Sequence, residues 1–155
     1  MTTPYLKAYV QGDWAAAPIM DQIGFSTNPV LQKTYQEFLE FLKAHDVENT
    51  ATWHLEAKGV ATGLGSKRKM TDVVRNTRQI DQADCVISYL ILNNPDKRHW
   101  GSLSLMGYAI GRGKPCYIIA NPDCVVWQSH FVWHPLIRRF HTVEEFETYL
   151  EEKKN

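Results

Sequence analysis

The sequence has 155 residues, which is enough for one domain with a buried core and too few for two domains of ordinary size. Its 17 basic and 17 acidic residues cancel to a formal net charge of zero. This balance argues against a general nucleic-acid binder and against a protein held on an acidic membrane, because both usually carry a basic excess.

The N-terminal part predicts one strand and one helix. LKAYV at 6–10 has the length and apolar character of a short buried strand. Asn28 is placed to cap a helix, and Pro29 suits its first position, where the missing N–H costs nothing. One apolar stripe at helical spacing then runs along Leu31, Tyr35, Phe38 and Leu42.

The next segment predicts a strand, a loop and a helix. TATWHL at 50–55 is typical of a strand, and the Gly-rich basic run at 57–69 is typical of a loop. That run matches neither the P-loop nor the Rossmann fingerprint, although its basic residues could touch a phosphate. Thr71 is a candidate cap for a helix that has on one side Val73, Thr77 and Ile80.

A third strand and a third helix follow. DCVISYLIL at 84–92 predicts a buried strand, and NNPDKRHWG at 93–101 has the composition of a loop. Ser102 is the expected cap of the helix, and Gly113 is expected to end it. The inner stripe of this helix contains Leu103, Met106, Ala109 and Ile110.

The C-terminal part begins with PCYIIA at 115–120, which predicts a fourth strand. An irregular, aromatic-rich segment at 121–136 either covers a pocket or packs against a second subunit. IRRFH at 137–141 fits a short edge strand. Thr142 and Glu145 form a capping box for a last helix, whose inward residues are Val143, Phe146 and Leu150.

This alternation of strands and helices predicts a single α/β domain over 1–155, with a parallel sheet covered by helices on both faces. In such sheets ligands bind beyond the carboxyl ends of the strands, where the strand order reverses. The front of the helix at 102–112 should face this crevice with its unpaired N–H groups. The same rule marks the segments 11–16, 54–69, 91–100 and 120–134.

The N-terminus, the apolar runs and the cysteines favour a cytoplasmic location. The N-terminus lacks the basic, apolar and small-residue order of a signal peptide, and the longest apolar run, at 85–92, is too short to span a bilayer. Cys85 and Cys116 stand in apolar runs, where a thiol usually packs as a small hydrophobic group. We expect a cytoplasmic protein that binds neither membrane nor nucleic acid.

Several stretches resemble the nucleoside 2-deoxyribosyltransferase superfamily. IDQADCVISYL at 80–90 and WGSLSLMGYAIGRGKPCYIIA at 100–120 are similar to its ADxVV strand and its GTxxEIGYAxxxGKPV helix and strand. YVQGDW at 9–14 is similar to its first strand and YLAGP turn. Trp100 and the tripeptide at 134–136, HPL, resemble the YtoQ branch most closely. The resemblance covers most of the chain and is specific over 80–120.

The resemblance implies a flavodoxin/Rossmann-like sheet of about five strands in the order 2-1-3-4-5, with a pocket for a nucleoside or nucleotide. Active members cleave the bond between base and deoxyribose. Their nucleophile is a glutamate on the helix equivalent to 102–112, helped by an aspartate on the preceding helix. A carboxylate captures the anomeric carbon as it gains oxocarbenium character, while an acid protonates the departing base.

Two residues of this sequence depart from that pattern. Gly101, Ser102 and the Gly-Tyr-Ala at 107–109 match the family motif, and this register puts Leu105 at the position of the nucleophile. Spacing back from Asp84 puts Asn76 at the position of the supporting aspartate. An aliphatic side chain cannot attack and an amide cannot act as a carboxylate, so the covalent route of the family is not expected.

Asp13 and Glu56 are the alternative candidates for catalysis. They follow the first and second predicted strands, which are neighbours in the order 2-1-3-4-5, so both carboxylates could face one pocket. Such a pair could activate water and protonate a leaving base without a covalent intermediate. The structural alternative is that Asp13 caps a turn and Glu56 is a solvated loop residue.

The remaining candidates are binding residues. Aromatic rings could stack on a base, and the start of the helix at 102–112 could bind a phosphate or a sugar hydroxyl, although each of these side chains also has a plain structural use. His130 and His134 are too few for a zinc site, and we expect neither metal nor cofactor. The predicted substrate-binding set is Gln11, Gly12, Trp14, His54, Asn76, Asn93, Trp100, Gly101, Ser102, Ser104 and Leu105.

The sequence therefore predicts a protein that binds a nucleoside or nucleotide, with two alternatives for its activity. One is a divergent N-glycosidase that hydrolyses the bond between base and deoxyribose without a covalent glutamate intermediate. The other is a non-catalytic pseudoenzyme that senses a nucleotide-like metabolite. In either case we expect a homo-oligomer, of two or more copies.

Overall fold

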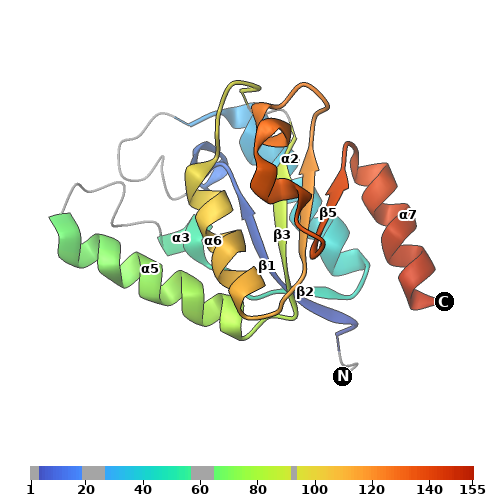
Figure 1. Cartoon of the computed structure of the whole chain (residues 1–155), viewed down its shortest axis with the longest axis horizontal. Coiled ribbons are helices and arrows are strands. Elements are labelled where there is room, and N and C mark those ends of the chain that lie inside the picture. The colour runs from blue at the N-terminus through green and yellow to red at the C-terminus, as the bar shows by residue number, and fades with distance from the viewer. Residues whose placement is uncertain (1–3, 19–26, 57–64, 92–93) are drawn as a thin grey trace.

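A five-stranded, all-parallel sheet of order β2-β1-β3-β4-β5 forms the centre of the molecule (Figure 1). The computed structural model describes residues 4–18, 27–56, 65–91 and 94–155. The predicted fold class and strand order are confirmed. The strands are β1 (Leu6–Gly12), β2 (Val47–Asn49), β3 (Cys85–Leu90), β4 (Cys116–Ala120) and β5 (Ile137–Phe140).

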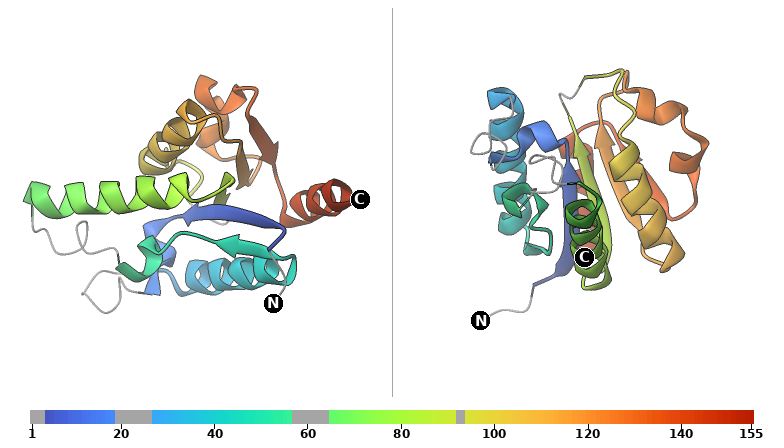
Figure 2. Two further views of the ribbon diagram at one scale, coloured as in Figure 1. Left: turned by 90° about the horizontal axis from the view of Figure 1, so that it is seen from below. Right: turned by 90° about the vertical axis from the view of Figure 1, so that its left-hand side faces the viewer.

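Helices cover both faces of the sheet (Figure 2). On one face lie α2 (Pro29–Ala44) and α7 (Val143–Lys154), and on the other α5 (Gly65–Asp81) and α6 (Trp100–Gly111). Burial on both sides explains why every residue of β3 and β4 is inaccessible, as their apolar sequences predict. Short helical turns complete the fold: η1 (Trp14–Ala16), α3 (Trp53–Glu56), η2 (Val125–Gln128) and η3 (His130–Trp133).

Two helices begin where their capping residues predict. The Asn28 side-chain oxygen accepts hydrogen bonds from the backbone of residues 30 and 31, at 3.0 and 3.2 Å, and the four stripe residues of α2 are buried. The Thr142 hydroxyl accepts from the Glu145 N–H at 3.1 Å, and the Glu145 carboxylate accepts from the His141 N–H at 2.9 Å. Phe146 and Leu150 point inward as predicted.

The predicted second strand at 50–55 is wrong. β2 ends at Asn49, and the segment from Trp53 to Glu56 is the helical turn α3. The side chain of Asn49 explains the difference, because its amide oxygen accepts from the N–H groups of Val10 at 3.2 Å and Ala51 at 2.9 Å. A side chain thereby takes the donor that the next step of the β1–β2 ladder would use.

The predicted starts of two helices are also wrong. α5 begins at Gly65, six residues before Thr71, because the intervening lysines, arginine and methionine are good helix formers. α6 begins at Trp100, and its N-cap is His99 in the left-handed region with φ 55°, rather than Ser102. The first bond of this helix runs from the Leu103 N–H to the His99 carbonyl at 2.9 Å, so Ser102 lies inside the first turn.

The cysteines are buried, free thiols, which confirms that they pack as small hydrophobic groups. Burial raises the pKa of the Cys85 and Cys116 thiols to about 12, so both stay protonated at neutral pH. Within the described ranges, no helix combines the length and the apolar character that crossing a bilayer requires.

Candidate functional site

A pocket of about 530 Å³ opens at the carboxyl edge of the sheet, beside the end of β1. This is the position at which the strand order reverses, because the chain leaves β1 for β2 on one side and pairs with β3 on the other. Its walls are η1, the middle of α5, the segment at 97–99 and the front of α6. The volume lies in the range of small-molecule sites.

The pocket gathers most of the predicted site residues. Those that line it are Gln11, Gly12, Asp13, Trp14, Asn76, Trp100, Gly101, Ser102 and Leu105. Ser104 and His54 are not among the lining residues: the Ser104 hydroxyl donates to the Trp100 carbonyl of its own helix at 2.9 Å. Asn93 and the side chain of Glu56 lie outside the described part of the chain. The aromatic segment at 124–136 does not line the pocket either.

Asp13 caps a turn, as the structural alternative predicts, and it also lines the pocket. One carboxylate oxygen accepts from the Ala15 N–H at 2.9 Å and caps η1. The other lies 2.7 Å from the Lys97 ammonium, and the Asp13 side chain is only 6% exposed. Lys97 also lies 5.7 Å from the centre of the Trp14 ring, so the pair is partly shielded from water. The Asp13 carboxylate is therefore held in place by a cation that the sequence pattern did not indicate.

Two buried polar atoms of the pocket residues have no hydrogen-bond partner among the described residues. Gln11 donates through Nε2 to the Ser88 hydroxyl at 2.7 Å and to the Ser102 carbonyl at 3.0 Å, which fixes its amide and leaves Oε1 unpaired. His99 Nε2 is likewise unpaired. An unmatched buried polar atom costs about 1–3 kcal/mol, so a ligand that supplies the missing partners would recover that free energy.

His99 is neutral at physiological pH. Burial, reinforced by the Lys97 ammonium and opposed by the Asp13 carboxylate, lowers the pKa of His99 from 6.5 to about 4. A neutral imidazole offers one donor and one acceptor, which suits recognition of a polar, uncharged group. It does not suit proton donation by His99 to a leaving base at neutral pH.

This pKa predicts a pH-dependent stability. Folding lowers the pKa, so as the pH falls the unfolded chain takes up the proton first, and stability drops between pH 6.5 and about 4. At pH 4 we expect His99 to account for a loss of roughly 2–3 kcal/mol in the free energy of unfolding. Urea unfolding from pH 7 to 4 measures it, with His99→Asn as the matched variant, because Asn also tolerates the left-handed backbone. An unchanged difference between the two proteins across this range would contradict the assignment.

Tryptophans supply the flat surfaces of the pocket. Trp53 is buried, and its indole N–H donates to the Val10 carbonyl at 2.8 Å, which fixes the ring. Trp14 is 39% exposed and Trp100 is 70% exposed, far more than a core tryptophan would be. An aromatic ring that stands open beside a pocket can stack on a planar ligand.

On α5, Asp72 and Arg75 line the pocket beside Asn76, and neither was predicted from the sequence. Arg75 donates to the Asn76 side-chain oxygen from Nε at 3.2 Å and from Nη2 at 3.1 Å, and it lies 3.4 Å from the carboxylate of Asp72. Asp72 stands one helical turn before Asn76, so the i, i+4 rule applied to Asn76 could have found it. The other unpredicted lining residues are Tyr9, Trp53, Lys97, Arg98 and His99.

Comparison with known proteins identifies no family for this chain. Neither a scan against protein-family models nor a search of curated proteins gave a match. The resemblance to the deoxyribosyltransferases therefore stands on the quoted motifs alone, and the chemistry of the pocket has to be argued from its own residues.

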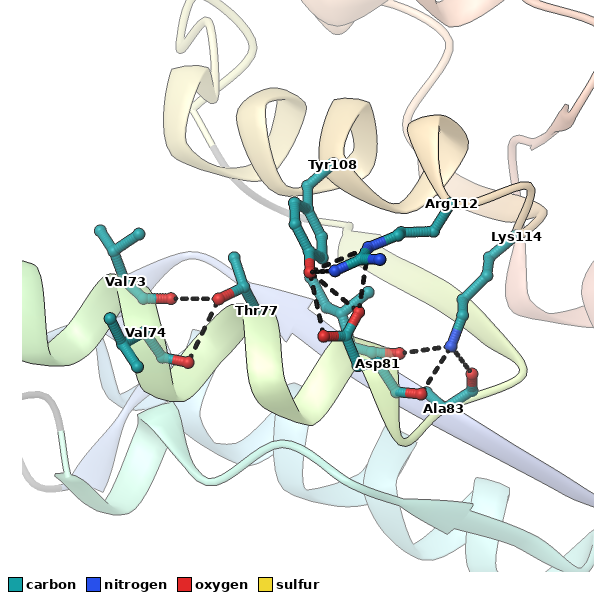
Figure 3. A network of polar contacts seen from close by, with 9 residues as sticks. Val73, Val74, Thr77, Asp81, Ala83, Tyr108, Arg112 and Lys114 are labelled. Atoms are coloured by element: carbon teal, nitrogen blue, oxygen red, sulfur yellow. Dashed lines mark hydrogen bonds and ion pairs between the residues drawn. The ribbon is translucent and has the colours of Figure 1, made fainter.

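Tyr108 and Lys114, which belong to the motifs quoted above, make polar contacts to the end of α5 (Figure 3). The Tyr108 hydroxyl donates to the Asp81 carboxylate at 2.9 Å, and Arg112 donates to the Tyr108 oxygen at 2.8 Å. The Lys114 ammonium caps the end of α5 by donating at 2.6–2.9 Å to the carbonyls of Ile80, Asp81 and Ala83. The Tyr and Lys of the Gly-Tyr-Ala and Gly-Lys-Pro motifs thus join α5 to α6 and need no ligand to explain them.

Proposed function

We propose that this pocket binds a nucleoside or a nucleotide. The proposal rests on two observations in one pocket at the reversal of strand order: open tryptophan faces, and two buried polar atoms that have no hydrogen-bond partner in the described part of the chain. Trp14 and Trp100 offer faces for the base. Gln11 Oε1 accepts a hydroxyl or amine hydrogen, and His99 Nε2 pairs with a second polar group.

Charge near the mouth of the pocket is compatible with a phosphate. Lys97 and Arg98 line it next to the N-terminus of α6, whose unpaired N–H groups favour anions. Lys97 is paired with Asp13, so of these two cations Arg98, which is exposed, is the one available to an anionic group. Both nucleosides and nucleotides therefore belong in the test.

The proposed activity excludes the transfer of deoxyribose by the standard covalent route, through a glutamate on α6. Leu105 lines the pocket where the family carries its nucleophilic glutamate, and α6 contains no acidic residue at all. No carboxylate ester can form on this helix. A binding or sensing protein is the function that these residues support best.

Hydrolysis of an N-glycosidic bond is the second candidate, and the observation that favours it is the pair of carboxylates in the lining, Asp13 and Asp72. Glycoside hydrolysis needs one carboxyl group to activate water and one to protonate the leaving group. Glu56, the other acid predicted from sequence, remains a candidate on the same chemical grounds.

Thermal unfolding with a panel of nucleosides and nucleotides tests the binding proposal. At a ligand concentration of 100 times Kd, we expect the melting temperature to rise by about 5–10 °C, because binding adds roughly 2.7 kcal/mol. Gln11→Leu should weaken binding by about tenfold through loss of one hydrogen bond. Ser104→Ala is the control, since its hydroxyl is bonded within α6. Failure of the whole panel to stabilise the protein would overturn the proposal.

Product analysis then separates the two candidates. Stabilisation without turnover supports a sensor. Release of free base that Asp13→Ala, Asp72→Ala or Glu56→Ala abolishes supports the hydrolase. Exchange of one base for another that survives all three substitutions would contradict the exclusion of covalent transfer.

A further inference from the structure

A second group of titratable side chains lies at the opposite edge of the sheet from the pocket. His45 follows the last residue of α2, and Glu147 and Glu151 stand one turn apart on α7. His45 Nε2 lies 3.1 Å from a Glu147 carboxylate oxygen and 3.6 Å from a Glu151 oxygen. One ligand atom from each residue falls within 4.8 Å of both others.

The imidazole of His45 is oriented for coordination. Its Nδ1 lies 2.9 Å from the Phe41 carbonyl oxygen, which can only accept, so Nδ1 carries the hydrogen. The lone pair of the neutral ring is then on Nε2, the atom that faces the two carboxylates. A ring N–H bonded to a backbone carbonyl is the arrangement that fixes the tautomer of metal-binding histidines. The ring also packs 4.3 Å from that of Phe41, and the side chain is 17% exposed.

The two negative charges of Glu147 and Glu151 favour binding of a cation. Three potential ligand atoms, His45 Nε2 and one oxygen of each glutamate, lie within 4.8 Å of one another. Two glutamates at i, i+4 on one helix also repel each other. A divalent ion bound between these atoms would compensate both negative charges.

The distances from His45 Nε2 to the two carboxylate oxygens fit a small tetrahedral ion. Zinc bonds to imidazole nitrogen and carboxylate oxygen at about 2.0–2.2 Å, and such bonds at tetrahedral angles place the ligand atoms about 3.3–3.6 Å apart. The observed 3.1 and 3.6 Å lie close to that spacing. Three protein ligands also leave one position for water, as in sites that exchange their metal ion or act on a substrate.

We propose that His45, Glu147 and Glu151 form a binding site for a divalent transition-metal ion such as zinc. The ion joins the end of α2 to the middle of α7. It is independent of the nucleoside pocket, because the two sites lie at opposite edges of the sheet and share no residue.

Titration calorimetry of the full chain with Zn²⁺ tests this site, and the absorption spectrum of bound Co²⁺ reports its geometry. We expect one equivalent to bind, with a rise in melting temperature of about 5 °C at saturating metal. His45→Gln and Glu151→Gln should each weaken binding by more than about tenfold, since even residues that merely orient a ligand have effects of that size. Glu152→Gln is the matched control, because it removes the same charge from the next position of α7.

Glu151 is 65% exposed, so Glu151→Gln is expected to fold even if His45→Gln does not. Equal zinc affinity in the wild type and Glu151→Gln would overturn the proposal, as would the absence of zinc binding by the wild type. Binding that is lost equally in Glu152→Gln would show a general effect of charge and would also overturn it.

Discussion

Truncation of Phe146 to alanine is expected to lower the free energy of unfolding by about 4 kcal/mol and the melting temperature by about 10 °C. Phe146 is completely buried on the inner face of α7. Its ring lies 5.2 Å from that of Phe140, 5.9 Å from that of Tyr117 and 6.3 Å from that of Phe38, measured between ring centres. The substitution removes the contacts that join α7 and α2 to the sheet, and the surrounding rings are too large to collapse into the cavity.

Urea unfolding measures this effect, with Glu152→Ala as the control. Glu152 is an exposed residue on the same helix, so its replacement should change the free energy by less than about 0.5 kcal/mol. The dependence of free energy on urea should stay the same in both variants. A loss below about 1.5 kcal/mol for Phe146→Ala would show that the core around α7 is packed differently.

Replacement of Lys97 by methionine is expected to cost about 2–3 kcal/mol. Lys97 lies 2.7 Å from Asp13, whose side chain is 6% exposed. Its loss leaves a buried carboxylate that, among the described residues, keeps one hydrogen bond, from the Ala15 N–H. Breaking a fully buried pair costs about 3–5 kcal/mol, and the 35% exposure of the Lys97 side chain lowers the expected cost to just below that range. Thermal or urea unfolding of the two proteins at pH 7 gives the difference.

The double variant Lys97→Met/Asp13→Asn is the internal control. Asparagine retains an oxygen that can cap η1 and removes the buried charge, so the double variant should recover about 1–2 kcal/mol relative to Lys97→Met. Strictly additive effects of the two substitutions would show that Asp13 and Lys97 do not stabilise each other. If Asp13 and Lys97 do stabilise each other, any chemistry in the pocket has to use Asp13 as a carboxylate whose charge is compensated by the Lys97 ammonium.

Local patterns in the sequence predicted most of the fold. Apolar runs marked β1, β3 and β4, and the caps at Asn28 and Thr142 marked the starts of α2 and α7. These features depend on neighbours within a few residues, so they can be read along the chain. β2 was misplaced because the signal that ends it is not local: Asn49 bonds to Val10, which is 39 residues away.

The sequence by itself determined an α/β domain with a parallel sheet, and it predicted that a ligand would bind at the carboxyl edge of that sheet, where the structure has a pocket. Only the tertiary structure decided the state of the site residues. Asp13 is paired with Lys97, Gln11 Oε1 has no partner among the described residues, and His99 has a neutral ring. These states arise from groups far apart in the chain or from burial. Periodicity predicts which elements form, but charge compensation and hydrogen-bond satisfaction depend on distances that exist only after those elements pack.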